Sequence, residues 1–385
     1  MNRPILQAAI AAVLCAACQS QGSAQPEENG TGAERPFSVT EVADFGSPWA
    51  MAFLPGRGVR LTNLALLTEK EGRLWIVDVT SGKRTAVSGV PEAKVAGQGG
   101  LGDVMPHPDF AANSRVYLSY VEAGDNGTSG AVLGYGTLDL ADPNAPALRD
   151  FRLIWRQQPK VSGNGHFSHR IAFGPDGFLY LSSGERQKMT PAQDLGGNLG
   201  KVLRLTHEGA PAPGNPFAGK GGIAREIWSM GHRNMLGLQF APDGRLWVAE
   251  MGPQGGDEIN LVLPGRNYGW PRASNGSHYG GGEIPDHRPG DGYEAPKVWW
   301  NPSISPGGLL IYDGDAFPAW KGDALVAALS GEALLRVDLD GDAAKKAERW
   351  PMGARIRAVD QGPDGSIYLL EDGNSGGRLL RLRPR

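Results

Sequence analysis

Residues 226–271 hold the side chains whose types and spacing are best suited to chemistry. Residues 231–234 (GHRN) place a cation and an amide in a glycine-flanked turn, and residues 251–256 (MGPQGG) end a β-rich run abruptly. Asp257 and Glu258 follow at once. Glycine and proline at this density leave backbone carbonyls outside strand pairing, and adjacent carboxylates add hard oxygens, which suits a calcium-type cation. An ordinary glycine-rich loop with a solvated acid pair explains the same residues.

Two other glycine-rich segments carry polar side chains. His166 lies in residues 163–170 (GNGHFSHR), where the backbone can approach a ligand closely. Histidine is the usual general base near neutral pH, although a lone histidine is more often structural, and His169 lies only three residues on. Gln98 lies in residues 97–101 (GQGGL), which a tight turn explains equally well.

Arg355 and Arg357 form a further candidate for ligand binding. Alternate residues of an extended chain point the same way, so both guanidinium groups are expected on one side. Arginine offers fork-shaped donors that match a carboxylate, and the pair therefore suits a polycarboxylate ligand. Two surface arginines in ion pairs are the alternative interpretation.

Composition favours many turns around a real core. The chain has 385 residues, with Gly 57 and Pro 29, yet 40% of the residues are hydrophobic. This combination is typical of short strands rather than disorder. The net charge of −3 argues against nucleic acid or an anionic membrane surface as a partner.

A turn rich in proline, aspartate and glycine recurs next to β-rich runs. The spacing of 53 to 67 residues is that of four-stranded propeller blades, and the longer intervals leave room for insertions at 187–197 and 275–294. Sustained helical periodicity is absent from the sequence. We therefore predict an all-β fold, a six-bladed β-propeller of four-stranded antiparallel blades. The six turns are marked by Pro55, Pro108, Pro175, Pro242, Pro306 and Pro363.

The N-terminus predicts export. A basic residue precedes an apolar run that is too short to span a bilayer, and both cysteines lie within this segment, so no disulfide is expected in the mature fold. Residues 1–18 resemble a bacterial lipoprotein signal with Cys18 as the lipidated residue, while a soluble periplasmic protein is the alternative. Residues 19–36 are expected to form a flexible linker, and residues 37–385 the catalytic propeller. We expect a periplasmic or cell-envelope location.

Several of these motifs match one family in order. The chain resembles the soluble aldose sugar dehydrogenases that depend on pyrroloquinoline quinone (PQQ), relatives of soluble quinoprotein glucose dehydrogenase. The resemblance covers about residues 40 to 383 and implies a six-bladed propeller that oxidises aldoses at C1 to the lactone with PQQ and calcium. It leaves the electron acceptor open between a quinone and a cytochrome. The matching segments are 97–101, 166–170, 231–234, 252–260, 267–271 and 355–357.

The resemblance also implies individual roles. His166 matches the general base, which takes the proton of the anomeric hydroxyl while hydride passes to the C5 carbon of PQQ. Arg233 matches the residue that polarises the C5 oxygen and stabilises the charge developing there. The remaining cofactor contacts implied are Gln98, Asn234, Arg355 and Arg357.

Two calcium sites are implied as well. The carbonyls of Gly252 and Pro253 match ligands of a calcium that also holds PQQ. Glu258 and the carbonyl of Tyr268 match ligands of a second, structural calcium.

Two positions depart from the family pattern. Ser330 stands where family members often carry a basic residue that touches PQQ, so we expect weaker cofactor binding. His169 stands where the family tends to have glycine, and its imidazole is expected either to narrow the sugar pocket or to add a hydrogen bond.

Two other functions use the same fold. A calcium-dependent hydrolase of the lactonase kind needs carboxylate and amide ligands around a metal in the central channel and has no use for Arg355 and Arg357. A non-catalytic propeller that binds sugar or a partner protein is the other alternative.

Overall fold

The computed structural model describes residues 34–55, 61 and 63–385. The predicted signal peptide, the lipidation site at Cys18 and most of the predicted linker lie outside the described residues. Within the part that is described, no helix is long and apolar enough to cross a membrane.

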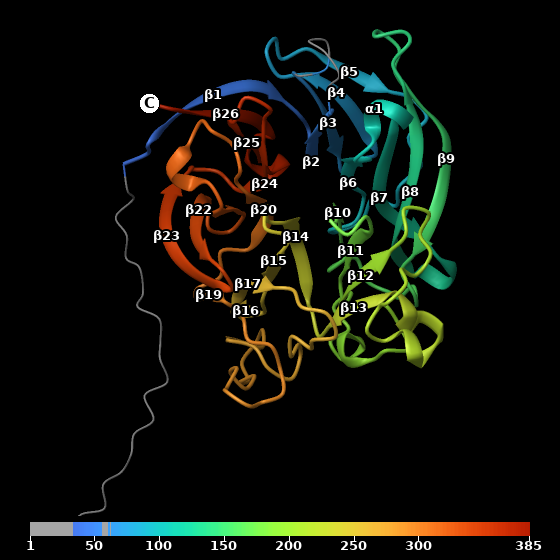
Figure 1. Ribbon diagram of the computed structural model, residues 1–385, viewed down its shortest axis with the longest axis vertical. Helices are drawn as coiled ribbons and strands as arrows, with labels where there is room; N and C mark the ends of the chain where they lie inside the picture. The colour runs from blue at the N-terminus through green and yellow to red at the C-terminus, as the bar shows by residue number, and fades with distance from the viewer. Residues whose placement is uncertain (1–33, 56–60, 62) are drawn as a thin grey trace, which may run out of the picture. The chain divides into compact units, whose positions relative to one another are not determined.

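Residues 34–385 form six four-stranded antiparallel sheets around a common centre (Figure 1), so the predicted six-bladed propeller is confirmed. The innermost strands of neighbouring blades contact one another in a closed ring. The only α-helix among the described residues is α1 (Phe110–Asn113). The first three blades, from the centre outward, are β2 (Pro48–Phe53), β3 (Leu64–Glu69), β4 (Arg73–Asp78) and β5 (Arg84–Val87); β6 (Leu101–Pro106), β7 (Arg115–Ala123), β8 (Ser129–Asp139) and β9 (Ala147–Arg156); and β10 (Ser168–Phe173), β11 (Leu179–Ser183), β12 (Lys201–Leu205) and β13 (Ile227–Met230).

The other three blades follow the same order, and a separate two-stranded sheet pairs β16 (Gln254–Gly255) with β18 (Gly276–Ser277). Blades four to six are β14 (Asn234–Phe240), β15 (Leu246–Met251), β17 (Asp257–Leu261) and β19 (Val298–Trp300); β20 (Pro306–Ile311), β21 (Ala324–Ala328), β22 (Ala333–Asp340) and β23 (Ala343–Pro351); and β24 (Ile356–Gln361), β25 (Ile367–Glu371), β26 (Arg378–Pro384) and β1 (Phe37–Asp44). The short 3-10 helices are η1 (Asp125–Gly127), η2 (Thr190–Gln193), η3 (Ala218–Lys220), η4 (Gly222–Glu226), η5 (Pro318–Trp320) and η6 (Gly373–Ser375).

The repeated turn occupies the same place in five of the six blades. There its proline lies two residues beyond the end of the innermost strand and leads into the second strand. The fifth unit is different and corrects the prediction, because Pro306 begins the innermost strand β20 and the corresponding turn starts at Asp313. Proline is tolerated at the first residue of a strand, where its missing N–H leaves the ladder intact. The predicted number of blades is therefore right, although Pro306 lies at the start of the innermost strand and the other five prolines lie after its end.

The two ends of the described chain meet in the sixth blade. β1 pairs with β26, from Phe37 opposite Pro384 to Asp44 opposite Arg378. Strands distant in sequence thus complete one sheet, with β1 as its outermost strand, and this pairing closes the ring of blades.

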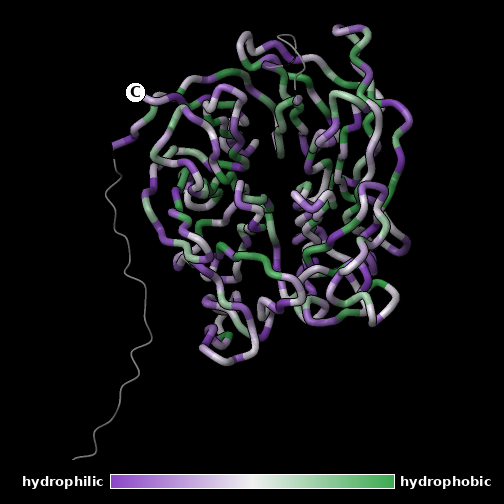
Figure 2. Tube along the Cα trace, viewed as in Figure 1, coloured by the Kyte–Doolittle hydropathy of each residue, from purple (hydrophilic) through white to green (hydrophobic). Residues whose placement is uncertain are grey.

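The hydrophobic core lies between the blades. One cluster joins strands of blades one and two, and another joins blades four and five. Figure 2 shows hydrophobic residues concentrated along the strands and hydrophilic ones along the connecting loops. The inner strands therefore bury both faces, whereas outer strands such as β1 and β23 stay largely exposed, and the loops are left to form a site.

Candidate active site

A cavity of about 830 Å³ lies at one end of the innermost strands. It brings together all the predicted site residues except Glu258 and Tyr268. A volume of this size accommodates a small cofactor together with a substrate. The predicted residues that line it are Gln98, His166, Arg233, Asn234, Gly252, Pro253, Arg355 and Arg357.

His166 forms a buried pair with Glu185, a residue that the sequence did not single out. The Nδ1 atom of His166 lies 2.5 Å from Oε1 of Glu185, which follows β11. Burial lowers the pKa of His166, although the hydrogen bond with Glu185 opposes this. Burial raises the pKa of Glu185, but its hydrogen bonds with His166 and the Met189 amide outweigh this and leave the pKa below its usual value. A charged Glu185 can only accept, so His166 carries its proton on Nδ1 and keeps Nε2 as a base.

The loop around His166 is held by two side chains, those of Gln98 and Arg186. The His166 amide donates to Oε1 of Gln98 at 2.7 Å. The buried guanidinium of Arg186 donates to the carbonyls of Gly163 and Gly165 at 2.5 and 2.9 Å and lies 3.7 Å from the ring centre of Phe167. Gln98 therefore positions the histidine as well as lining the cavity.

Arg233 lies between β13 and β14 and lines the cavity. Its guanidinium forms no ion pair with a carboxylate among the described residues. Its amide donates to Glu250, and its Nη1 donates to the carbonyls of Met251 and Gly252 at 3.1 and 2.5 Å. Its Nε atom is buried and has no hydrogen-bond partner among the described residues. The rings of Trp270 and Tyr279 lie 5.1 and 5.8 Å from its guanidinium carbon. Arg233 thus lines the cavity with a guanidinium that has one unpaired donor among the described residues.

Asn234 begins β14 beside Arg233. Its Oδ1 accepts a hydrogen bond from the Ser168 hydroxyl at 3.2 Å, and its Nδ2 lies 3.6 Å from the sulfur of Met251. The amide is therefore fixed in the cavity wall.

Arg355 and Arg357 point to the same side, as predicted, and share one carboxylate. The Nε atom of Arg355 and Nη2 of Arg357 donate to separate oxygens of Asp372 at 3.1 and 3.0 Å. Burial raises the pKa of Asp372, but the two guanidinium groups outweigh this and lower it overall. Two positive charges facing one negative charge leave a net positive wall for an anionic ligand.

The loop carrying Gly252 and Pro253 is organised by Asp257. Asp257 Oδ1 accepts from the Gly252 amide at 2.8 Å, and Oδ2 accepts from the Ile304 and Ser305 amides at 2.7 and 2.6 Å. This carboxylate therefore shapes the loop that carries Gly252 and Pro253.

Glu258 lies away from the cavity in a buried polar group. It stands opposite Glu250 in the pairing of β15 with β17, and burial, followed by the charges of Glu250 and Asp257, raises its pKa to about 8. Its Oε2 accepts from Asn260 at 3.1 Å, while Oδ1 of Asn260 is buried with no partner among the described residues. Unsatisfied oxygens beside a buried carboxylate are suited to a hard cation.

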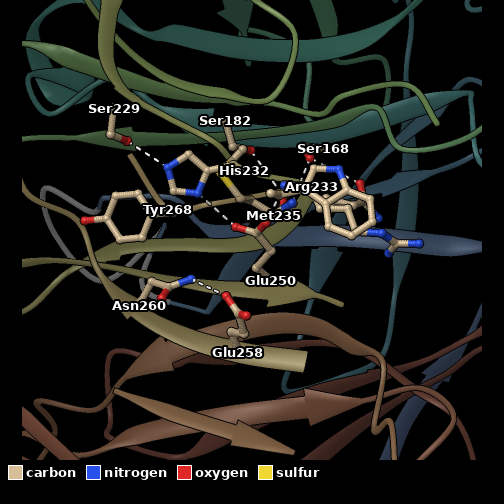
Figure 3. Close-up of polar contacts among 12 residues, drawn as sticks. Ser168, Ser182, Ser229, His232, Arg233, Met235, Glu250, Glu258, Asn260 and Tyr268 are labelled. Carbon is tan, nitrogen blue, oxygen red and sulfur yellow. Dashed lines mark hydrogen bonds and ion pairs between the residues drawn. The ribbon is translucent and has the colours of Figure 1, made fainter. Parts of the chain in front are cut away.

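Tyr268 belongs to the same neighbourhood (Figure 3). Its ring stacks on His232 at 4.5 Å, and His232 Nδ1 lies 2.9 Å from Oε2 of Glu250. Among the described residues, no three His, Cys, Asp or Glu side chains converge as a metal-binding group. The predicted calcium ligands are mostly backbone carbonyls, so such a cluster of side chains is not needed for them.

The two departures from the family pattern have different settings. Ser330 lines the cavity, and its hydroxyl lies 2.8 Å from the Ser305 hydroxyl. His169 stacks on Trp49 at 5.1 Å and bonds the Ser119 hydroxyl through Nδ1 at 2.8 Å. Burial lowers the pKa of His169 to about 3. Its ring therefore backs the wall residue Trp49 and adds a hydrogen bond away from the cavity.

Comparisons with known proteins agree with this geometry. The family model for glucose/sorbosone dehydrogenase matches residues 45–381. The aldose sugar dehydrogenase YliI of Escherichia coli is 40% identical over 344 residues, which covers 88% of this chain and 90% of that protein.

Solved structures give the same result. The apo form of the soluble aldose sugar dehydrogenase from Escherichia coli has a TM-score of 0.84 and 39% identity, with 91% of this chain and 100% of that chain covered. The PQQ-bound aldose sugar dehydrogenase from Streptomyces coelicolor has a TM-score of 0.73 and 29% identity, with 90% and 98% covered. This chain, with its six-bladed propeller and its cavity at the end of the inner strands, belongs to the glucose/sorbosone dehydrogenase family.

Proposed function

We propose that this protein is a PQQ- and calcium-dependent dehydrogenase that oxidises aldose sugars at C1 to the lactone. The observation that carries the proposal is the His166–Glu185 pair at 2.5 Å, on a wall of the cavity that also holds Arg233. A neutral histidine oriented by a carboxylate is a suitable base for the proton of an anomeric hydroxyl.

The residues present fit PQQ, which is a planar tricarboxylate. Arg355 and Arg357 offer donors to its carboxylates, and the buried Nε of Arg233 is a donor that lacks a partner among the described residues. Gln98 and Asn234 add amides to the same wall. A relative of known structure, the Streptomyces coelicolor enzyme, is described as PQQ-bound.

The residues also fit calcium. The carbonyls of Gly252 and Pro253 belong to a cavity-lining loop that Asp257 holds in place, and carbonyl oxygens are typical calcium ligands. The Gly252 carbonyl already accepts a hydrogen bond from Nη1 of Arg233. Because a calcium ion on that carbonyl would repel the guanidinium, we expect Arg233 to turn toward the cofactor when the site is filled. Glu258 and the Tyr268 carbonyl are the proposed ligands of a second calcium, supported by the unsatisfied Oδ1 of Asn260.

The chain's own groups then divide the chemistry. His166 takes the hydroxyl proton on Nε2, and Glu185 stabilises the positive ring that results. PQQ, when bound, supplies the electrophilic quinone carbon that accepts the hydride from C1. Arg233 stabilises negative charge that develops on the oxygen it faces.

The remaining assignments concern the protein's surroundings. The substrate class is the aldoses, the acceptor is a quinone or a cytochrome, and the location is the periplasm or cell envelope with a lipid anchor at Cys18. Fractionation of the native host tests the last point, since a Cys18→Ser variant is expected to move from the membrane fraction to the soluble fraction.

The test of function is dye-linked oxidation of glucose and other aldoses, with and without PQQ and Ca²⁺ and with an EDTA-treated control. We expect activity only with both additions, and a loss of about 10²- to 10⁴-fold in His166→Asn with PQQ still bound. Absence of activity on every aldose, together with no retained PQQ absorbance, favours a non-catalytic binding propeller instead.

A further inference from the structure

Tyr279 is an exposed aromatic side chain at the edge of the cavity. It lines the cavity, yet 71% of its surface is accessible. It lies in the insertion at 275–294, in a turn closed by hydrogen bonds between His278 and Gly282 at 3.0 Å and between Gly281 and His278 at 3.2 Å. A large ring held at the mouth of a cavity, rather than packed into the core, is available to contact a ligand that enters there.

The hairpin that carries Tyr279 is fixed at its base to the proposed calcium loop. β16 and β18 pair Gln254 with Ser277 and Gly255 with Gly276. The approach is so close that a side chain on Gly256 would place its Cβ 2.6 Å from the Gly276 nitrogen. The ring's position is therefore set by the same loop that presents the Gly252 and Pro253 carbonyls.

The other aromatic walls of the cavity are already covered. Phe167 is stacked under the Arg186 guanidinium at 3.7 Å. Trp49 is enclosed by the His169 ring at 5.1 Å and the Arg170 guanidinium at 4.0 Å. Both rings are buried, whereas the one cation that faces the Tyr279 ring among the described residues is the more distant Arg233, at 5.8 Å.

We propose that Tyr279 is a substrate-binding residue whose ring stacks on the apolar C–H face of an aldopyranose. The inference rests on the proposed function and identifies what faces the sugar on the solvent side. Sugar binding sites combine a few polar contacts with aromatic surface, because the ring carbons of a pyranose present C–H groups between the hydroxyls. The exposed location suits a substrate that exchanges at each turnover better than it suits a resident cofactor.

The test compares Tyr279→Ala and Tyr279→Phe with Tyr293→Ala, a matched control in the same insertion whose ring packs against His287 at a centre distance of 6.5 Å. Calorimetry on the PQQ-loaded enzyme measures the Kd of 1,5-anhydroglucitol, which lacks the anomeric hydroxyl and is not oxidised. A PQQ titration of each apoprotein and the KM for glucose, galactose and xylose complete the set.

We expect Tyr279→Ala to raise the Kd of 1,5-anhydroglucitol and the KM of the aldoses about 3- to 10-fold. Tyr279→Phe and Tyr293→Ala should stay within about twofold of wild type, and the Kd of PQQ should be unchanged throughout. An active Tyr279→Ala enzyme with unchanged sugar Kd overturns this inference alone, as does a variant that loses PQQ affinity but not sugar affinity. Wild-type protein that oxidises none of the aldoses and binds no PQQ overturns the proposed function, and this inference with it.

Discussion

Two buried arginines, Arg170 and Arg233, lie on successive blades and have opposite surroundings. They are about equally buried, with exposures of 8% and 6%. Arg170 donates from Nε to the Leu236 carbonyl at 2.7 Å, from Nη1 to Asp103 at 3.0 Å and from Nη2 to the Gly307 carbonyl at 2.8 Å. It thereby links inner strands of four blades.

Arg233 has a buried Nε without a hydrogen-bond partner, and its guanidinium forms no ion pair with a carboxylate among the described residues. Burial alone therefore does not separate a scaffold arginine from a functional one. The distinction is whether the donors are saturated, because a buried polar group without a partner is costly unless a ligand supplies it.

The largest effect on stability is expected for Arg170→Met. The change leaves the Asp103 carboxylate buried without its charged partner, and we expect the free energy of unfolding to fall by about 3–5 kcal/mol. Urea unfolding measures it. Adding Asp103→Leu to the same chain should recover part of the loss; a single variant as stable as wild type would remove the scaffold role from the comparison.

Arg233→Met should show the opposite pattern. We expect kcat to fall about 10²- to 10³-fold, as when one donor to a developing negative charge is removed. The free energy of unfolding should fall by only about 1–2 kcal/mol, because the bonds lost are to two neutral carbonyls and no buried carboxylate is left without its partner. Unfolding and kcat measured on the same preparation decide this, and a strongly destabilised but active variant would contradict it.

Glu185→Gln sharpens the comparison by altering a partner instead of an arginine. His166 acts as a base only when neutral, so activity falls as the pH drops through its pKa, which burial places below the usual histidine range. Because the Glu185 hydrogen bond raises that pKa, its removal should shift the acid limb of kcat/KM to still lower pH. We also expect kcat to fall about 10- to 100-fold from the disturbed tautomer. A pH–rate profile that is unchanged in shape and height would show that the pair is merely structural.

The smallest effect is expected for Ser330→Lys. A lysine at position 330 would place a cation in the cavity, where it could pair with a carboxylate of PQQ. We expect an exposed ion pair of this kind to lower the Kd of PQQ about 2- to 5-fold. Fluorescence titration of the two apoproteins measures it. Equal affinities would show that Ser330 is not a defect in cofactor binding.

The fold could be predicted from the sequence because the turns that separate the strands are marked by short local motifs. Five of the proline turns follow the innermost strand of their blade, and Pro306 differs because it starts a strand. The closure of blade six was not accessible, since Phe37 and Pro384 pair across almost the whole chain. Nothing in the β1 sequence identifies its partner strand.

The site was predictable where motifs are contiguous and not where geometry assembles it. His166 and Arg233 lie in recognisable glycine-rich turns, but Glu185 is separated from His166 by a whole hairpin. A carboxylate directly after the buried strand β11 was the one available signal. Arg170 is the last residue of the 163–170 segment, and its type alone does not reveal the four-blade network, which depends on inner strands that meet at the channel.

We propose that His166 initiates oxidation of an aldose when PQQ and calcium occupy the cavity. Anaerobic mixing of the loaded enzyme with glucose, in the absence of any electron acceptor, isolates that step. We predict a single-turnover loss of the oxidised-cofactor absorbance in wild type, slowed by about 10²- to 10⁴-fold in His166→Asn. Equal rates in the two proteins would contradict the account.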